Sequence, residues 1–209
     1  TFVKADIADR DAILPLAGRF PDVTGIIHLA AQAGVRHSLI DPYSYVKSNV
    51  EGQLVMLELA RRFEKLAHMV YASSSSVYGA NTKMPFSVED PVESPVSLYA
   101  ATKRSGELMA YTYAHLYGLA LTGLRFFTVY GPWGRPDMAY WLFTEKILKG
   151  EPVQIFNHGD MMRDFTYIDD VVSGILSVLA HPPVGSEDAP AHKVYNIGNN
   201  KPEKLLDFV

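Results

Sequence analysis

A serine, a tyrosine and a lysine in this sequence have the types and the spacing that proton transfer at an alcohol requires. Ser74 lies in residues 71–79, which read as a buried strand that ends in a polar loop. Tyr99 and Lys103 lie in residues 98–103, which read as the start of a helix. The i,i+4 spacing places phenol and ammonium on one helical face. The ammonium favours the ionised phenol, and Ser74 can hydrogen-bond the substrate oxygen that exchanges the proton.

The energetic requirement indicates which reaction this triplet serves. A free tyrosine titrates near pH 10, so a phenolate at pH 7 needs its pKa lowered by about 3 pH units, or roughly 4 kcal/mol. One ammonium supplies part of this, and an oxidised nicotinamide ring would add a second positive charge. We therefore predict hydride chemistry at a carbon that bears a hydroxyl. Tyr43 and Lys47 have the same spacing, but no serine-rich strand end precedes them, so the Tyr99 pair is favoured.

Strand and helix signals alternate along the part of the chain that must position these residues. Strands are predicted at 2–5, 23–30, 69–72 and 121–127, and helices at 9–20, 41–65 and 97–117. Ser97 is the expected N-cap of the last helix, and Gly118 should end it. Such alternation predicts right-handed β-α-β units and a parallel sheet with helices on both faces.

The character of the sequence changes after residue 132. A helix is predicted at 138–149, a short strand at 153–156, a helix capped by Thr166 that runs to about residue 180, and a last strand at 193–197. Residues 182–190 read as a polar linker. We expect this part to cover a cleft at the carboxyl ends of the strands, where open α/β sheets bind ligands.

Composition excludes several classes of function. The 209 residues are 48% hydrophobic and 20% charged, with a net charge of −4 and no basic cluster, so nucleic acid is not an expected partner. There is no cysteine, and the seven histidines have no zinc-like spacing, so neither disulfides nor a metal site are expected. No apolar run approaches the length of a membrane span. A cytoplasmic protein without membrane contact fits these features.

Seven blocks of sequence, in this order and spacing, resemble the extended short-chain dehydrogenases/reductases of the NAD-dependent epimerase/dehydratase family. The blocks cover residues 28–35, 49–52, 73–79, 99–103, 125–132, 163–170 and 195–198. The resemblance implies an α/β fold: a Rossmann-type doubly wound parallel sheet without its first β-α-β unit, and a smaller α+β substrate-binding lobe. Residues 1–131 would form the partial NAD-binding domain. Residues 132–209 would form mainly the UDP-sugar lobe, with elements near 166–181 and 193–197 returning toward the core.

The resemblance also implies the reaction, which is 4-epimerisation of a UDP-sugar with NAD. Conversion of UDP-glucuronate to UDP-galacturonate is the first candidate. Tyr99 would take the proton of the 4-hydroxyl while hydride leaves C4, and a transient 4-keto sugar would turn and be reduced on its other face. Related dehydratases carry an Asp-Glu pair where this chain has Ser75 and Ser76, which favours epimerisation without elimination. Another UDP-sugar epimerase, a dehydratase and a catalytically silent nucleotide-sugar-binding module remain alternatives.

The preference for a uronate is an expectation that depends on Thr128 and Arg135. Epimerases for neutral sugars tend to carry asparagine where Thr128 stands. The Arg135 guanidinium would hold a C6 carboxylate through two parallel hydrogen bonds, and Arg36 could serve the same anion.

The remaining site residues are carried over from the family. The expected cofactor contacts are Asp6 and Ile7 at the adenine, Leu29, Ala30, Ala31 and Gln32 at the ribose and pyrophosphate, Asn49 beside the site, Phe126 near the nicotinamide, and Tyr99 and Lys103. The expected substrate contacts are Ser74, Ser75, Ser76, Arg36, Thr128 and Arg135, with Gln154 and Phe156 at the uracil and Arg163 at the diphosphate.

One part of the family pattern is missing. The glycine-rich loop that cradles the NAD pyrophosphate, and the acidic residue for the adenosine ribose, would precede Thr1. We therefore expect this segment to be a fragment that binds NAD poorly, if at all, and is inactive by itself. A central apolar strand without its neighbour would invite pairing with another chain. A homodimer formed through the two long helices is expected from the relatives.

Overall fold

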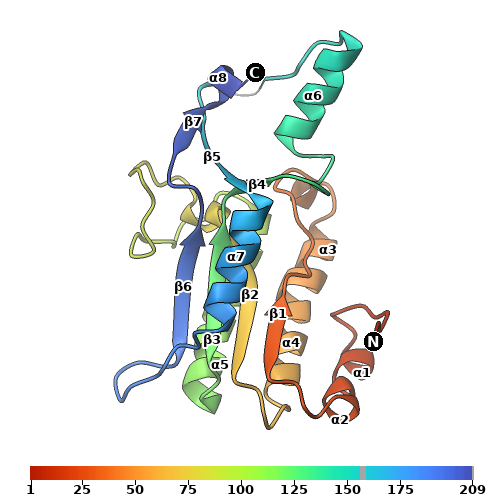
Figure 1. Ribbon diagram of the computed structural model, residues 1–209, viewed down its shortest axis with the longest axis vertical. Helices are drawn as coiled ribbons and strands as arrows, with labels where there is room; N and C mark the ends of the chain where they lie inside the picture. The colour runs from red at the N-terminus through yellow and green to blue at the C-terminus, as the bar shows by residue number, and fades with distance from the viewer. Residues whose placement is uncertain (156–158, 209) are drawn as a thin grey trace. The chain divides into compact units, whose positions relative to one another are not determined.

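The chain divides into two compact units in the computed structural model, which describes residues 1–155 and 159–208. The first unit contains Thr1–Arg125 and Ile175–Asn196, and the second contains Phe126–Gly174 and Ile197–Val209. Each unit has its own sheet (Figure 1).

A four-stranded sheet forms the centre of the first unit. Its strand order is β1-β2-β3-β6, with β1 at Gly25–His28, β2 at His68–Ser74, β3 at Leu121–Phe126 and β6 at His192–Ile197. β1 and β2 run parallel, with Gly25 opposite His68 and His28 opposite Tyr71. Figure 1 shows α4 and α5 behind this sheet and the end of α7 in front of it. The predicted α/β class, a parallel sheet with helices on both faces, is confirmed.

The helices of the first unit are shorter and more broken than predicted, apart from α5. They are α1 (Arg10–Ile13), α2 (Leu16–Arg19), α3 (Pro42–Tyr45), α4 (Gly52–Ala60) and α5 (Leu98–Tyr117). The predicted helix at 9–20 is interrupted at Leu14 and Pro15, because proline has no backbone N–H to continue it. The predicted helix at 41–65 ends at Ala60, and its middle, Val46–Glu51, is π-helical. Two 3-10 turns cover His37–Leu39 and Ser75–Tyr78.

Both predicted caps of α5 are confirmed. Ser97 is its N-cap, and the Ser97 hydroxyl oxygen accepts from the Ala100 N–H at 3.1 Å. Gly118 follows the last turn with φ +65°, a left-handed conformation that glycine adopts without the steric cost of a Cβ.

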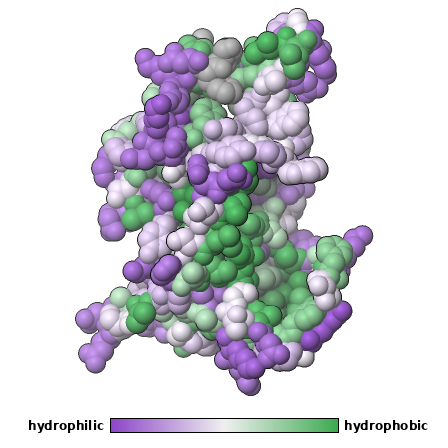
Figure 2. Space-filling view, viewed as in Figure 1, coloured by the Kyte–Doolittle hydropathy of each residue, from purple (hydrophilic) through white to green (hydrophobic). Residues whose placement is uncertain are grey.

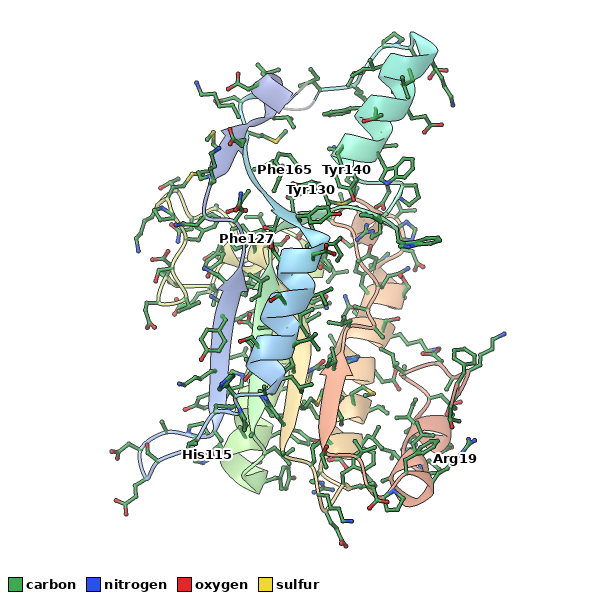
Figure 3. All side chains as sticks on the ribbon, in the orientation of Figure 1. Arg19, His115, Phe127, Tyr130, Tyr140 and Phe165 are labelled. Carbon is green, nitrogen blue, oxygen red and sulfur yellow. The ribbon has the colours of Figure 1, made fainter. Side chains whose placement is uncertain are left out.

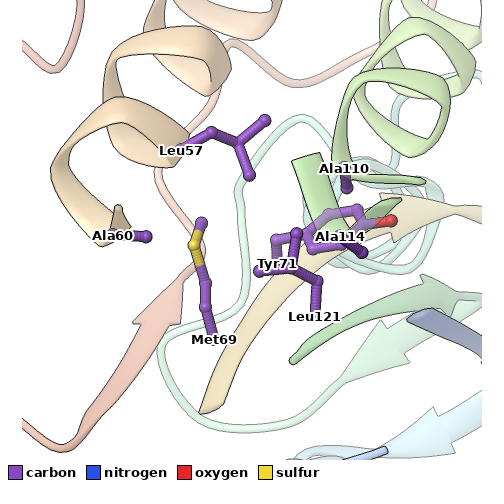
Figure 4. Packing of buried hydrophobic residues seen from close by; sticks show 7 residues of the cluster. All are labelled: Leu57, Ala60, Met69, Tyr71, Ala110, Ala114 and Leu121. Carbon is purple, nitrogen blue, oxygen red and sulfur yellow. The ribbon is translucent and has the colours of Figure 1, made fainter. Parts of the chain in front are cut away.

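A fully buried cluster joins α4 and α5 to the sheet (Figure 4). Leu57 and Ala60 of α4 meet Met69 and Tyr71 of β2, while the small residues of α5 let the helix approach the strands closely. The whole cluster comprises Leu57, Ala60, Met69, Tyr71, Ala110, Ala114 and Leu121. A second cluster around Ile13, Val55, Leu59 and Phe63 attaches α1 to α4.

Apolar side chains also reach the surface of the first unit. Figure 2 shows them gathered on the face that carries α7 and β1. Ile27 of β1 and Leu176 of α7 are 40% and 54% exposed there.

The second unit contains a three-stranded sheet of order β4-β5-β7. The strands are β4 (Thr128–Tyr130), β5 (Met162–Tyr167) and β7 (Pro202–Lys204); β4 and β5 are parallel, and β5 and β7 are antiparallel. Figure 3 labels the aromatic residues Tyr130 of β4, Phe165 of β5 and Phe127, which directly precedes β4. The helices are α6 (Ala139–Lys149), α7 (Ile168–Leu179), whose residues from Ile175 count with the first unit, and α8 (Leu205–Phe208).

Three predictions of secondary structure are wrong. Residues 2–5 form no strand, and Phe2 is 88% exposed. A strand needs a neighbour for its backbone hydrogen bonds, and neither sheet of the described residues pairs with this segment. Thr166 does not cap α7: it lies in β5 opposite Val129, and its hydroxyl donates to Asp164 Oδ1 at 3.2 Å. Residues 153–155 form no strand, and Phe156 lies outside the described residues.

Within residues 1–155 and 159–208, none of the helices combines the length and the apolar character that crossing a bilayer requires.

Candidate active site

Lys103 lies buried against the end of β2. Its Nζ donates to the carbonyl oxygen of Ala72 at 2.9 Å, two residues before Ser74, and only 8% of the residue is exposed. Burial lowers the pKa of Lys103 to about 8. At pH 7 about nine in ten of these side chains still carry the proton. The first unit therefore holds a positive charge beside the strand end where Ser74 lies.

Ser74 is the last residue of β2 and caps the 3-10 turn that follows. Its hydroxyl oxygen accepts from the Ser76 N–H at 3.2 Å, and its hydroxyl donates to Ser76 Oγ, also at 3.2 Å. Ser74 is buried, whereas Ser75 and Ser76 are half-buried. The three serines therefore lie at and just after the carboxyl end of β2.

Tyr99 lies on the first turn of α5, one turn before Lys103 and on the same face. The residue is half-buried, and its ring meets the ring of Tyr45 edge-on, with centroids 6.1 Å apart. Tyr45 is fully buried, and its hydroxyl lies 2.8 Å from the Ala33 carbonyl oxygen and 2.6 Å from that of Gly34. Tyr45 therefore contacts both the Tyr99 ring and the loop that follows β1.

The second Tyr-x-x-x-Lys pair has a different environment. Tyr43 is 85% exposed on α3. Lys47 Nζ donates to Asp6 Oδ2 at 2.8 Å in a solvent-exposed ion pair. This pair therefore lies at the surface and away from a serine-bearing strand end.

Asn49 joins two of the segments that the family pattern assigns to the cofactor. Its Oδ1 accepts from the Gln32 N–H at 2.8 Å, while its Nδ2 donates to the Gln32 carbonyl oxygen at 2.9 Å and to Thr102 Oγ1 at 3.0 Å. The π-helical stretch Val46–Glu51 presents this side chain, and such insertions are frequent at functional sites. The amide thereby fixes the loop after β1 to the helix that carries Tyr99 and Lys103.

The other predicted cofactor residues of the first unit lie near the ends of β1 and α1. Leu29 and Ala30 directly follow β1 and are exposed, and Ala31 is half-buried. Asp6 is exposed, and its Oδ1 accepts from the Ala8 N–H at 3.0 Å. Ile7 packs against Gly52, where an added Cβ would come within 2.8 Å of Ile7 Cδ1.

The predicted substrate residues fall in both units. Arg36 is exposed in the first unit, just before the 3-10 turn at His37–Leu39. The second unit contains the predicted substrate residues Thr128, Arg135, Gln154 and Arg163, and also Phe126, which was predicted to contact the cofactor. Arg135 is exposed and forms a two-bond pair with Asp137, Nε to Oδ1 at 3.0 Å and Nη2 to Oδ2 at 2.5 Å. Arg163 is exposed on β5 and donates to the Met162 carbonyl oxygen at 3.0 Å.

Sequence reasoning missed two buried ionisable groups beside the triplet. His28 ends β1 and is 7% exposed; burial, and then the positive charge of Lys103, lower its pKa to about 4. It is therefore a neutral imidazole at pH 7. Glu107 lies one turn beyond Lys103 and is 1% exposed. The i,i+4 repeat from Tyr99 through Lys103 to Glu107 is the sequence signal that could have found it.

A Rossmann-like sheet with a buried lysine beside a strand that ends in serine is typical of nucleotide-dependent oxidoreductase folds. Comparison with known protein families identifies the family. The NAD dependent epimerase/dehydratase family matches residues 1–198, so the chain belongs to this family.

Two individual relatives show how similar the chain is to known members of this family. The chain is 54% identical over 222 positions to protein CapI of Staphylococcus aureus, a match that covers 100% of this chain and 65% of CapI. It is 52% identical over 216 positions to UDP-glucuronate 4-epimerase 4 of Arabidopsis thaliana, covering 99% of this chain and 49% of that protein. The chain thus spans 65% and 49% of the lengths of these two relatives.

The fold matches a solved structure of a related enzyme over the whole chain. UDP-glucuronic acid 4-epimerase from Bacillus cereus, in complex with UDP-glucuronic acid and NAD, superposes with a TM-score of 0.86 at 35% identity. The superposition covers 100% of this chain and 63% of the Bacillus cereus chain.

Proposed function

We propose that this protein epimerises C4 of a UDP-sugar with NAD, and that UDP-glucuronate, converted to UDP-galacturonate, is its substrate. The observation that carries the proposal is the environment of Lys103. This ammonium is buried, stays largely protonated at pH 7, and contacts the strand that ends in Ser74, one helical turn from Tyr99. The names of the Arabidopsis thaliana and Bacillus cereus relatives support the choice of substrate.

The residues present at the end of β1 suit part of a nicotinamide dinucleotide. Leu29 and Ala30 are exposed, the loop at Gln32 is fixed by Asn49, and the Lys103 ammonium supplies charged donors. These groups can hold a ribose and orient a nicotinamide. When bound, NAD supplies the acceptor, and then the donor, of the hydride at C4.

Tyr99, Lys103 and Ser74 transfer the proton of the sugar hydroxyl at C4. The hydroxyl at C4 loses its proton to the Tyr99 oxygen as the hydride leaves the same carbon, so a 4-keto sugar forms. The positive charge of Lys103 stabilises the phenolate that accepts this proton, and the Ser74 hydroxyl hydrogen-bonds the sugar oxygen. On return of the hydride to the other face, Tyr99 gives the proton back, and no net oxidation results.

Two serines argue against the dehydratase alternative. Elimination of water needs an additional acid and base, and Ser75 and Ser76 have hydroxyls that do not ionise near neutral pH. Ser76 is also engaged with Ser74 through its N–H and its Oγ. A cycle that ends with reduction at C4, without elimination, fits this set of side chains.

The finer properties of the whole protein belong to the same proposal. We expect a cytoplasmic enzyme, in keeping with the absence of cysteine. We also expect a homodimer formed through α4 and α5. These helices expose Leu54, Leu108 and Tyr111, large apolar side chains that a second copy would cover.

A single substitution tests the proposal. The parent in these tests is a longer chain that includes the glycine-rich segment expected before Thr1. This parent and its Tyr99→Phe variant are incubated with UDP-glucuronate and NAD, and the formation of UDP-galacturonate is followed by chromatography. We expect the parent to form it and the variant to lose turnover by about a thousandfold or more while UDP-sugar affinity, measured by calorimetry, stays within about twofold. Tight binding by the parent without turnover would favour the silent binding module, and loss of affinity together with turnover would assign Tyr99 a structural role.

A further inference from the structure

A buried carboxylate lies one helical turn beyond Lys103. Glu107 Oε1 accepts from Ser73 Oγ at 2.6 Å and from Arg125 Nε at 2.9 Å, and Oε2 accepts from Arg125 Nη2 and Arg104 Nη1, both at 2.9 Å. Burial alone would raise the pKa of Glu107, but the hydrogen bonds from Arg125 and Ser73 outweigh it and hold the pKa below its ordinary value. This carboxylate is therefore ionised and satisfied by four donors, as burial of a charge requires.

Arg125, near the end of β3, joins the same hydrogen-bond network to Tyr78, which follows the serine run. Its Nη1 donates to the Tyr78 hydroxyl oxygen at 3.0 Å, and its guanidinium stacks 4.8 Å from the centre of the Tyr78 ring. The Tyr78 hydroxyl donates to Asn196 Oδ1 at 2.6 Å, and Asn196 Nδ2 donates to the Phe86 carbonyl oxygen at 3.0 Å. Tyr78 is the last residue of the 3-10 turn that Ser74 caps.

The segment 73–78 is consequently held at both ends by one ion pair. Glu107 binds Ser73 at its start, and Arg125 binds Tyr78 at its end. Ser74 lies between the two contacts. In addition, successive turns of α5 contact successive residues of β2, because Lys103 donates to Ala72 and Glu107 accepts from Ser73. These two hydrogen bonds fix the register of the helix that carries Tyr99 against the strand that ends in Ser74.

We propose that the Glu107–Arg125 pair, together with Ser73, positions Ser74 against Tyr99 and Lys103 for catalysis. The inference rests on the proposed function for its kinetic consequence. These three are positioning residues: they act through the hydroxyl, the phenol and the ammonium rather than on the reacting atoms. A displacement of about 1 Å at reacting groups can cost about a hundredfold in rate, so the loss of one contact in this network should affect turnover more than substrate binding.

Ser73→Ala is the variant that tests this inference, because it removes one hydrogen bond and leaves the ion pair intact. Thr122→Val is the matched control. It removes one buried hydroxyl from the same sheet. Thr122 Oγ1 lies 2.8 Å from His68 Nε2 near the amino ends of β2 and β3, whereas Ser73 lies near the carboxyl end of β2. We expect Ser73→Ala to lower kcat roughly ten- to a hundredfold with KM within about twofold, and the control to keep the parental kcat.

Hydrogen–deuterium exchange supplies a second readout that needs no turnover. Peptides covering residues 74–79 should exchange faster in Ser73→Ala than in the parent and in Thr122→Val. Parental exchange in these peptides, or a kcat of Ser73→Ala equal to that of the control, would overturn the inference. A parent that does not convert UDP-glucuronate would instead refute the proposed function, and the exchange comparison would then decide on the positioning of the serine run by itself.

Discussion

At the scale of single residues, the proposed chemistry depends on an ammonium that is buried and yet charged. Burial alone brings the pKa of Lys103 down to about 8, and a further fall below 7 would remove the charge that stabilises the Tyr99 phenolate. The hydrogen bond to the Ala72 carbonyl oxygen replaces part of the lost hydration. Burial, and to a smaller extent the charge of the same ammonium, keeps His28 neutral, so Lys103 carries a positive charge here and His28 does not.

The buried imidazole of His28 predicts a loss of stability in acid. Its pKa is about 4 in the folded protein against 6.5 in an unfolded chain, so the unfolded state binds more protons between these values. Stability therefore falls as the pH drops from 6.5 to 4, by about 3 kcal/mol from this residue. In His28→Gln this part of the acid loss should vanish, as urea denaturation at pH 7, 5 and 4 can measure. Parallel pH dependences of parent and variant would contradict the prediction.

In the proposed function, selectivity for the uronate is assigned to Arg135. Its guanidinium already holds the Asp137 carboxylate through two hydrogen bonds, which is the geometry expected for a C6 carboxylate. Arg135→Ala should weaken binding of UDP-glucuronate by about tenfold and binding of UDP-glucose by less than twofold, as measured by calorimetry on the two nucleotide sugars. Equal losses for both ligands would remove the carboxylate role.

At the scale of elements, the two ends of α5 allow stability to be separated from activity. Ser97→Ala removes the N-cap two residues before Tyr99 and should cost about 1 kcal/mol. Gly118→Ala forces an L-residue to φ +65°, without any clash, at a cost of about 1 kcal/mol at the opposite end. Denaturation midpoints should fall similarly, but kcat should fall only in Ser97→Ala, because only that change loosens the turn that carries Tyr99. Equal kcat values would mean that the first turn needs no cap to hold the phenol.

Local signals predict the elements that depend on local interactions. α5 follows from its cap, its length and its terminal glycine, and β2 from a continuous apolar run. β4, β5 and β7 were not predictable in this way, because they are short, carry many polar side chains and exist only through pairing with one another. The spacing of Tyr99 and Lys103 predicts a shared helical face. The contacts of Glu107 with Ser73 and Arg125 join residues 34 and 18 positions apart, and only the folded chain reveals them.

At the scale of the whole molecule, this chain covers 63% of the Bacillus cereus enzyme that it superposes on, and β1 stands at one end of its four-stranded sheet. An edge strand presents unpaired backbone groups, and charged side chains on it discourage pairing with other chains. Here the edge strand exposes Ile27, and Leu29 follows it at 49% exposure. Such an edge favours association through added strands, in a manner distinct from the proposed dimer through α4 and α5.

The 209-residue chain by itself should therefore form species larger than two copies of 23.2 kDa, in a concentration-dependent way. Ile27→Lys places a charge on β1 and should reduce these species, whereas Val184→Lys adds the same charge to a loop residue that is 89% exposed and should not. Sedimentation velocity at several protein concentrations measures the size distribution for all three proteins. If the parent sediments only as monomer or dimer at every concentration, the edge of β1 is protected, and its exposed apolar residues have no part in association.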